Sequence, residues 1–571
     1  MTTTLPRWAA ELRDLFRSGS CAQFLLHGNI FDLVPQGARM LSVKNFLDEV
    51  MFRGYDVVLH YDRSRGIRAV HGAEDWDQWL RQALGDDARN SSYLREPGSA
   101  LELIDRFLLR TLNLQAIQDA SAAGRKLAVI IDFAEFVVPR GEAVALGGAF
   151  SANVVKVLGW ANDPAVLHAN IVTVLLTENL HDLNELVFEN PHAVALRIPL
   201  PDEADMREYL EALVAGQLPE LPARSDVPLE ALGRRLTGLS RVSAHRTLTL
   251  ALKNDARITP QWLTRMKKEA IERECQGLLE FVESGFTLDH VAGLDPVRAW
   301  LREDAELLRR GALHALPMGY LISGRIGTGK TFLVTCWAGE LGVPCVVFKN
   351  FRDRWVGATE SNLEKIFAVL RALGQVVVFV DEADQAAGRR EGGEGDGGLS
   401  GRVYSMLAKE MSDTRNRGRI IWVFATSRPD LLEVDLKRQG RLDVHIPLFP
   451  PQTAAERRAL LGAVARKLTL PLTDADLPEV PDRGLGGNEI EGVLVRGLRI
   501  WELSVEPRRP LKEILREVFA EVRPSAHTRK LEFMDLVAVK ECTDQRFLPP
   551  QFRDLTADEV ESRIDELRRF L

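Results

Sequence analysis

The stretch Gly324-Arg325-Ile326-Gly327-Thr328-Gly329-Lys330-Thr331 stands between an apolar run, Met318 to Ile322, and a run of helical character that begins at Phe332. Strand, glycine-rich loop and helix in this order are what a phosphate-binding loop requires. The glycines let successive backbone N–H groups turn toward the phosphates, and the N-terminus of the following helix favours negative charge. The stretch therefore predicts a nucleoside triphosphate site. The alternative is a glycine-rich turn with an incidental lysine.

The polar residues of this loop have separate predicted roles. Lys330 is expected to reach the β- and γ-phosphates, and the Thr331 hydroxyl is expected to ligate Mg²⁺. The loop and helix-start residues predicted to contact the nucleotide are Gly324, Gly327, Thr328, Gly329, Lys330, Thr331 and Phe332. The site thus implies ATP and Mg²⁺ as cofactors.

A second signature follows where the apolar run Val376 to Val380 leads directly into Asp381 and Glu382. Five apolar residues are typical of a strand buried on both faces of a parallel sheet, and open α/β sheets bind ligands at the carboxyl ends of such strands. Asp381 is expected to hold the magnesium ion and its hydration shell, and Glu382 to orient and polarise the attacking water. Taken alone, the pair could also be two solvated carboxylates.

From Phe286 to about Arg499 the sequence resembles AAA ATPases, the ring-forming remodelling enzymes. Their motifs occur in order: FTLDHVAGL at 286–294, the phosphate loop, RWVGATESNLEKIF at 354–367, the Asp381-Glu382 strand, FATSRPD at 424–430, KRQGRLD at 437–443 and GLGGNEI at 484–490. The resemblance implies an α/β fold of the P-loop NTPase type, with a doubly wound parallel sheet and a helical lid. It also implies Mg-dependent ATP hydrolysis in a homo-oligomeric ring, with a hexamer expected in the presence of ATP.

The resemblance assigns further catalytic roles. Ser427 occupies the position of the polar residue that senses the γ-phosphate, where the family usually has asparagine; its hydroxyl can still hydrogen-bond water but is shorter. Arg438 and Arg441 match the arginine fingers that enter the neighbouring subunit's site and stabilise charge on the transferring phosphoryl group. The active site would then be completed at a subunit interface. A solvated basic turn is the alternative for the two arginines.

Two segments match those that sandwich the adenine. One contains Asp289, Val291 and Ala292, and the other contains Gly487 and Asn488 at the start of a lid helix. Small residues at such positions allow the backbone to approach the base closely. Either segment alone would be typical of an ordinary turn.

Trp355 and Val356 fall where AAA unfoldases place an aromatic loop in the central pore. A flat, amphipathic ring can grip many different side chains of a threaded polypeptide, which makes this pair the predicted substrate contact. The alternative is a tryptophan folded back onto its own domain as a core anchor. The glycine-rich stretch 388–401 is either a second pore loop or a plain connection.

The first 270 residues show a similar order of elements without the phosphate loop. An apolar strand ends in Asp132, a second strand (171–176) ends in polar residues, and the candidate first strand (22–26) runs into 27–32 with one glycine and no lysine. We therefore predict two AAA modules in tandem: a degenerate module at 1–270, an ATPase core at 271–450, and a helical lid with a C-terminal helical extension at 451–571. Residues 269–284 are predicted to form a helix at the junction. The arrangement is similar to bacterial and plastid AAA proteins of the hypothetical chloroplast reading frame type; an unrelated α/β recognition domain is the alternative.

Composition excludes several other classes. The 571 residues include 73 basic and 81 acidic ones, a net charge of −8, with no polybasic block, so nucleic acid is not an expected partner. The five cysteines are scattered without metal-ligand spacing, which favours a reducing compartment. No apolar stretch reaches membrane-spanning length, and a cytoplasmic protein is expected.

Two function classes remain open on the sequence. The first is a ring-forming ATPase that couples ATP hydrolysis to remodelling, unfolding or disassembly of a protein or protein complex. The second is a nucleotide-gated scaffold or assembly switch with slow hydrolysis, which the serine at 427 and the missing first phosphate loop favour.

Overall fold

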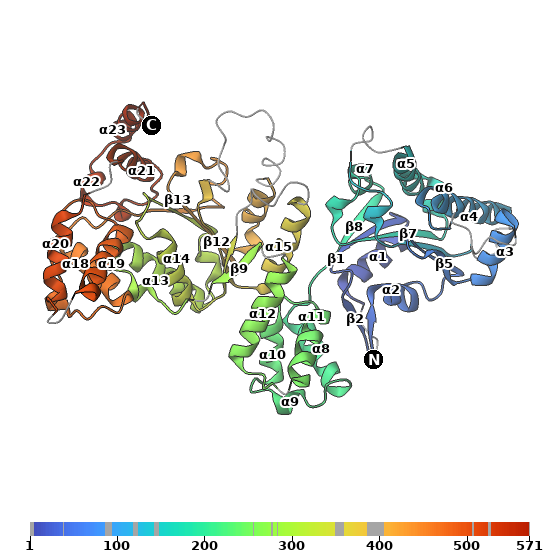
Figure 1. The fold of residues 1–571 in the computed structure, drawn as a ribbon. Helices are drawn as coiled ribbons and strands as arrows, with labels where there is room; N and C mark the ends of the chain where they lie inside the picture. The colour runs from blue at the N-terminus through green and yellow to red at the C-terminus, as the bar shows by residue number, and fades with distance from the viewer. Residues whose placement is uncertain are drawn as a thin grey trace. The chain divides into compact units, whose positions relative to one another are not determined.

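Two six-stranded sheets organise the chain, one in each half. The computed structural model describes residues 5–37, 39–85, 94–117, 124–141, 148–254, 256–275, 278–282, 284–348, 359–384, 405–504, 508–523 and 527–569. The chain divides into a first unit, Met1–Ala270 with Glu360–Ala372, and a second unit, Ile271–Thr359 with Leu373–Leu571 (Figure 1).

The sheet of the second unit has the order β14-β10-β13-β12-β11-β9. Its strands are β9 (Leu279–Val282), β10 (Gly319–Ser323), β11 (Cys345–Phe348), β12 (Val376–Val380), β13 (Ile420–Thr426) and β14 (Val444–Pro447). All neighbours pair in parallel except β9, which runs antiparallel to β11 at the edge. The central strands β10, β12 and β13 are buried throughout, as expected for strands covered on both faces.

The sheet of the first unit has the order β5-β4-β6-β7-β1-β8. Its strands are β1 (Gln23–Gly28), β4 (Val57–Asp62), β5 (Gly66–His71), β6 (Leu127–Ile131), β7 (Ile171–Thr177) and β8 (Ala193–Ile198). The two sheets have the same strand order. When β1, β4, β6, β7 and β8 are matched in chain order with β10, β11, β12, β13 and β14, each strand has the same neighbours as its counterpart. The antiparallel strands β5 and β9 lie on the same edge, beside β4 and β11. The predicted α/β fold with parallel sheets is confirmed, and the shared strand order supports tandem modules.

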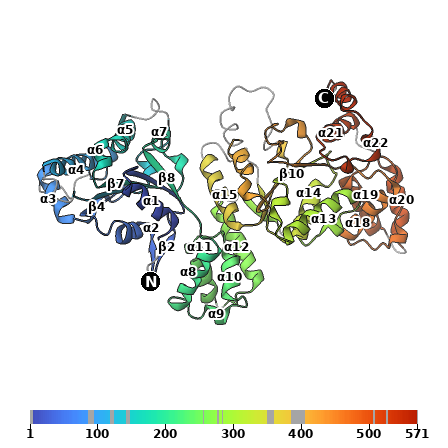
Figure 2. The ribbon, with the colours of Figure 1, turned by 180° about the vertical axis from the view of Figure 1, so that it is seen from behind.

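The helices of the first unit form two groups. The helices interleaved with the strands are α1 (Arg7–Arg17), α2 (Val43–Phe46), α3 (Ala73–Leu84), α4 (Pro97–Ile117), α5 (Gly148–Asn162), α6 (Pro164–His168) and α7 (Glu185–Phe188). After β8 come α8 (Glu203–Ala215), α9 (Leu221–Arg224), α10 (Leu229–Leu236), α11 (Arg241–Lys253) and α12 (Pro260–Glu274), which gather into one bundle (Figures 1 and 2). Asp202 forms a capping box at the start of α8, and Ser240 caps α11.

The predicted junction helix over 269–284 is partly wrong. The helix α12 ends at Glu274, and residues Leu279–Val282 form the edge strand β9, which pairs with β11 in register from Cys345↔Val282 to Phe348↔Leu279. A backbone partner from elsewhere in the chain decides the conformation of a short apolar segment that could form either element.

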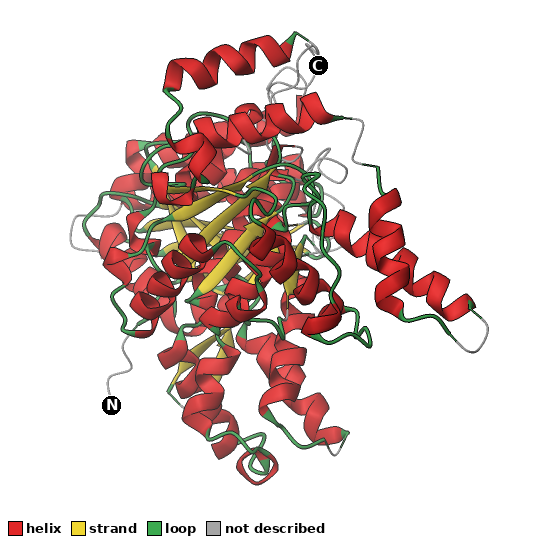
Figure 3. Cartoon of the chain, turned by 90° about the vertical axis from the view of Figure 1, so that its left-hand side faces the viewer, coloured by secondary structure: helices red, strands yellow, loops and turns green. Residues whose placement is uncertain are grey.

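In the second unit, helices cover the sheet and then build a lid and an extension. On one sheet face α13 (Asp295–Arg309) packs with α14 (Lys330–Leu341), and the Trp337 indole N–H donates to Leu301 O at 3.0 Å. The lid contains α18 (Ala454–Lys467), α19 (Gly487–Leu503) and α20 (Leu511–Glu521), and the extension contains α21 (Thr528–Lys540), α22 (Pro550–Arg553) and α23 (Ala557–Arg568). Val560 and Ile564 of α23 are buried in a small cluster with Phe533 of α21. Figure 3 shows the strands lying inside the layers of helices.

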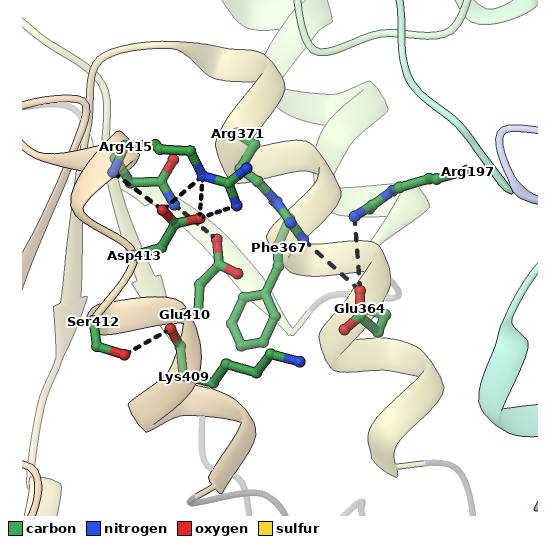
Figure 4. A network of polar contacts seen from close by, with 10 residues as sticks. Arg197, Glu364, Phe367, Arg371, Lys409, Glu410, Ser412, Asp413 and Arg415 are labelled. Atoms are coloured by element: carbon green, nitrogen blue, oxygen red, sulfur yellow. Dashed lines mark hydrogen bonds and ion pairs between the residues drawn. The ribbon is translucent and has the colours of Figure 1, made fainter. Parts of the chain in front are cut away.

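Ion pairs fix local segments of each unit (Figure 4). In the first unit, Glu364 of α15 (Thr359–Leu373) lies 3.8 Å from Arg197 and 3.7 Å from Arg371, and Lys365 lies 2.9 Å from Glu178. In the second unit, Asp413 pairs with Arg415 at 2.7 Å. Among the described helices, none combines the length and the apolar character needed to cross a bilayer.

Candidate nucleotide site

The loop between β10 and α14 needs its glycines. Gly324, Gly327 and Gly329 have φ values of 143°, 86° and 84°, in the region that disfavours side chains. A Cβ on Gly324 would lie 2.2 Å from Leu448 O, closer than any side chain can approach. Gly329 is the N-cap of α14, so the helix begins at Lys330 and directs its free N–H groups into the loop. This is the local geometry that binds phosphate.

The Lys330 ammonium lies folded into the loop. It donates to Gly324 O at 2.8 Å, to Arg325 O at 3.1 Å and to Ser427 Oγ at 3.1 Å. Burial lowers the pKa of Lys330 to about 8, although the nearby carboxylates of the 381–384 segment oppose that shift. Phosphate groups at this position would stabilise the charged form. The structure therefore brings together the predicted phosphate-binding lysine and the predicted sensor.

The two residues predicted to ligate Mg²⁺, Thr331 and Asp381, contact each other. The Thr331 hydroxyl donates to Asp381 Oδ2 at 2.8 Å, and Asp381 Oδ1 accepts the backbone N–H of Glu382 at 2.9 Å. Hydroxyl and carboxylate oxygens are ligands that Mg²⁺ prefers, and Mg²⁺ is commonly held by one or two protein oxygens together with water and substrate phosphates. The residues present therefore fit a nucleotide-bound magnesium ion.

Glu382 has a backbone conformation that is rare for a residue with a side chain, with φ of 47°. Its side chain is exposed beside the loop end of β12. The neighbouring strand is tied to the same segment, because the Thr426 hydroxyl donates to Asp384 Oδ1 at 2.6 Å. Asp384 and Thr426 were not singled out from the sequence, since only the pairing of β12 with β13 brings them together.

The lid helix α19 contacts the phosphate loop directly. The Gly487 backbone N–H donates to Gly327 O at 2.9 Å, and a Cβ on Gly486 would lie 2.8 Å from the same oxygen. A Cβ on Gly327 would lie 3.8 Å from Asn488 Cβ. The predicted Gly487 and Asn488 are thus beside the loop. Gly486 is an additional close contact that the sequence analysis missed, although its GLGGNEI context held the signal.

The segment predicted on the other side of the adenine lies against the start of α14. Phe286 packs against Phe332 with ring centroids 5.8 Å apart, and Val291 is buried in the core that includes α14. Asp289 is mostly exposed and pairs with Arg302 of α13. Ala292 follows directly on Val291 in the same segment. The segment is close to the loop, and the Asp289 carboxylate is engaged with α13.

Arg325 also takes part in the site, although no role was predicted for it from the sequence. Its guanidinium donates to Gly484 O at 2.5 Å and lies 3.7 Å from Asp535 of α21. Burial raises the pKa of Asp535 to about 6, against the lowering effect of Arg325. A cavity of about 450 Å³ is lined by these residues together with Gln551 and Arg563 of the extension. The phosphate loop is therefore linked by one side chain to both lid and extension.

The two candidate arginine fingers lie in the connection between β13 and β14. Arg438 and Arg441 both pair with Asp435, three and six residues before them. The predicted pore residues Trp355 and Val356, and the stretch 388–401, lie outside the described residues.

The corresponding place in the first unit has no glycine-lysine loop. The strand β1 ends at Gly28, whose φ is 92° and whose Cβ would lie 2.8 Å from Ile198 O, the same relation that Gly324 has to Leu448. The chain then forms a hairpin of β2 (Leu33–Gln36) and β3 (Arg39–Ser42) before it enters α2. The hairpin replaces the backbone nest that phosphates need.

In the first unit, charged side chains lie at the place that corresponds to the predicted metal site of the second unit. Lys44 of α2 lies 2.6 Å from Asp132, which follows β6 as Asp381 follows β12. His60 lies 2.7 Å from Asp48 and 3.8 Å from Asp132. Burial lowers the pKa of His60, but hydrogen bonds and charges from Asp132 and Asp48 outweigh it and raise the pKa to about 9. The residue after Asp132 is Phe133, whose ring packs against that of Phe31 with the centroids 5.8 Å apart.

Comparison with known families agrees with this division. Residues 2–199 match the model of an AAA+ chaperone N-terminal Rossmann-like domain, residues 205–276 that of an AAA+ chaperone second helical domain, and residues 320–449 that of the ATPase family associated with various cellular activities (AAA). The chain therefore contains an AAA ATPase domain, preceded by two domains of the AAA+ chaperone type.

Several characterised AAA proteins are similar to parts of it. The ATP-dependent zinc metalloprotease FtsH 1 of Symbiobacterium thermophilum is 36% identical over 197 residues, which cover 33% of this chain and 33% of that protein. The peroxisomal ATPase PEX6 of Rattus norvegicus is 27% identical over 65% of this chain and 42% of its own length. The cell division cycle protein 48 homolog of Archaeoglobus fulgidus is 27% identical over 64% of this chain and 53% of its own. The chain thus spans between a third and about half of these relatives.

Proposed function

We propose that the chain is a Mg-dependent ATPase that works as a ring, a hexamer with ATP, and couples hydrolysis to remodelling of a protein or protein complex. The observation that carries the ATPase part is the Thr331–Asp381 contact of 2.8 Å beside the Lys330 ammonium. A hydroxyl, a carboxylate and a lysine in this arrangement are the parts that hold a Mg–triphosphate.

Each further residue has one role in this proposal. Glu382 orients the attacking water. Ser427, whose hydroxyl accepts a hydrogen bond from Lys330, senses the γ-phosphate. Gly487 and Asn488 at the start of the lid helix close the lid over the nucleotide. Thr331 and Asp381 would hold a magnesium ion, which would neutralise charge on the phosphates. Arg438 and Arg441 complete a neighbouring subunit's site, because a guanidinium stabilises the charge of the transferring phosphoryl group.

The remodelling part rests on relatives and on the sequence. The similar proteins include a zinc metalloprotease, a peroxisomal ATPase and a cell division cycle protein. Trp355 and Val356 are the proposed substrate grip in the pore. All five cysteines are free thiols, which supports a reducing compartment such as the cytoplasm.

A nucleotide-gated scaffold is the second candidate. Two features of the first unit favour it. Lys44 pairs with Asp132 at the place of the predicted metal site, and Phe133 stands where the second unit has Glu382. Such a unit supports recruitment rather than hydrolysis.

One experiment separates the two candidates. ATP turnover of the full chain is measured with and without a reduced, alkylated and therefore unfolded model protein. A remodelling ring is expected to hydrolyse ATP several-fold faster with the unfolded protein, and this stimulation should vanish in the Lys330→Ala protein. An ATP turnover rate that is the same with and without the unfolded protein would favour the scaffold. The absence of ATP turnover in the wild type would contradict the ATPase proposal.

A further inference from the structure

Asp435 is the shared partner of both candidate arginine fingers. Its Oδ1 accepts a hydrogen bond from Arg438 at 3.0 Å, and its Oδ2 pairs with Arg441. Arg441 also donates to the backbone carbonyl of Asp435 at 2.5 Å. Hydrogen bonds from Arg441 and then Arg438 hold the pKa of Asp435 below its usual range. One carboxylate therefore balances two guanidinium groups.

The two arginines differ in how accessible they are. The Arg438 side chain is 69% exposed, whereas that of Arg441 is 17% exposed. Asp435 itself is 55% exposed, so its ion pairs lie at the surface and are weak enough to exchange. A competing anion can reach Arg438 first and Arg441 after it.

The backbone around this cluster is firmly anchored. Asp443 accepts the Met318 N–H at 2.7 Å and the Gly440 N–H at 2.5 Å. Lys437 donates to Pro429 O at 3.1 Å and to Glu541 at 2.5 Å. Release of the arginines from Asp435 therefore needs only side-chain rotation, because the loop that carries them is held at both ends.

We propose that Asp435 holds Arg438 and Arg441 in the free protomer and competes for them with the γ-phosphate of a neighbouring subunit's ATP, so that subunit association depends on ATP rather than ADP. The inference rests on the ring-forming function proposed above. A γ-phosphate carries more charge than a carboxylate and accepts bidentate hydrogen bonds from a guanidinium, so it displaces Asp435. ADP lacks this group. With ADP in the neighbouring site, the arginines stay on Asp435 and contribute little to the interface.

Asp435 acts as a positioning residue in this scheme, since it acts on the nucleotide only through Arg438 and Arg441. The test measures the protein concentration at which half of the full-length chain is assembled, by sedimentation velocity, with ADP and with a non-hydrolysable ATP analogue. In the Asp435→Asn protein, the concentration needed with ADP should fall by roughly three-fold or more, as expected for the loss of exposed ion pairs. The concentration needed with the ATP analogue should change much less.

Two variants serve as controls. Asp435→Glu keeps the carboxylate and should restore a clear preference for the ATP analogue. Asp565→Asn removes an equally exposed acid that pairs with Arg568 at 3.2 Å in α23, and it should leave the nucleotide preference unchanged.

The outcomes distinguish the inference from the function on which it rests. Wild-type protein that assembles with neither nucleotide would remove the ring proposal and the inference with it. The half-assembly concentration with ADP can be divided by that with the ATP analogue. If the wild type assembles and Asp435→Asn leaves this ratio unchanged, the role of Asp435 is overturned and the ring proposal stands. Weaker assembly of Asp435→Asn with both nucleotides would overturn it as well, since Asp435 would then only support the loop.

Discussion

Phe133 and Glu382 hold the same position relative to their two sheets, one residue after the aspartate that follows a buried parallel strand, and their φ values are 51° and 47°. Left-handed backbone at a non-glycine residue often marks a functional site. The left-handed conformation is also present in the first unit, where the residue is a phenylalanine without an acidic group. The unusual backbone therefore belongs to the shared fold, and the chemistry depends on which side chain it carries.

Lys330→Ala and Glu382→Gln should fail in different ways. Removal of the Lys330 ammonium should weaken ATP binding by roughly a hundredfold, because charge-assisted hydrogen bonds to the phosphates are lost. Glu382→Gln should bind ATP normally and hydrolyse it about 10²–10⁴-fold more slowly, because water is no longer polarised. Calorimetry for binding and phosphate release for turnover test both.

The same calorimetry counts nucleotide sites. The wild type should show one site per chain and Lys330→Ala none. A second site that survives Lys330→Ala would contradict a first unit without a phosphate loop, and near-normal turnover of Glu382→Gln would take the water-orienting role from that residue.

Lys44→Met should destabilise the first unit, although Lys44 lies outside every segment with a predicted catalytic or binding role. Asp132 is 1% exposed, and without Lys44 its charge would be left with His60 as the remaining cation. We expect a loss of about 2 kcal/mol in the free energy of unfolding, below the full range for buried pairs since Lys44 is partly exposed. Denaturant unfolding of the full chain measures this loss.

A matched variant shows whether burial is the cause. Arg234→Met breaks an exposed pair with Glu203 in the same unit and should cost less than about 1 kcal/mol. The double variant Lys44→Met/Asp132→Asn should recover part of the loss. Equal effects of the two single variants would show that the Lys44–Asp132 contact has no special weight.

The stability of the first unit should fall at alkaline pH because of His60. Its pKa is raised to about 9 from an ordinary value of 6.5, so the folded state binds the proton more tightly than the unfolded state. The stabilisation is therefore fully present below about pH 6.5 and is lost as pH rises through about 9, a change of roughly 3 kcal/mol. The unfolding free energy of wild type minus that of His60→Gln should show this decline; a flat difference from pH 6.5 to 9 would contradict it.

Arg441→Ala should bind ATP but lose hydrolysis by a factor on the order of 10³, as expected for a finger that acts in trans. Mixing it with Lys330→Ala protein should restore some turnover, because mixed rings can join an intact phosphate loop to an intact finger. Each variant alone is the control. Equal turnover per site in a dilute, monomeric preparation and in the assembled protein would show that no neighbour is needed.

Trp355→Ala should uncouple hydrolysis from work. Basal ATP turnover should stay within a few-fold, since Trp355 lies outside every predicted nucleotide-binding segment. Stimulation by an unfolded protein should disappear, because an aromatic contact of about 1 kcal/mol is lost in every subunit. Unfolding of the variant, followed by circular dichroism, would indicate a core anchor, and full remodelling activity would contradict the pore role.

Much of the architecture follows from local patterns. The strands that end in Asp381 and Asp132 are apolar runs followed by an acid, and the structure has both of them as buried parallel strands. The glycine loop is equally local, since its positive φ values demand glycine at fixed spacing.

Features that depend on distant partners could not be predicted in this way. The Lys44–Asp132 contact joins residues that are far apart in sequence, and nothing in the apolar pattern around Lys44 marks it. Arg325 meets Gly484 and Asp535 only after lid and extension have folded. The strand β9 has the spacing of a helix, and its pairing with β11 overrides that preference.

The ion pair between Lys44 and Asp132 also sets what the first unit can sense. A magnesium nucleotide enters, reacts and leaves, whereas the lysine ammonium is covalently attached and stays in place through every cycle. The acid at the end of β6 therefore meets the same positive charge whether ATP is abundant or exhausted. In the ATPase cycle proposed above, movement of the first unit would therefore come from its contacts with other parts of the protein and not from a nucleotide at the end of β6.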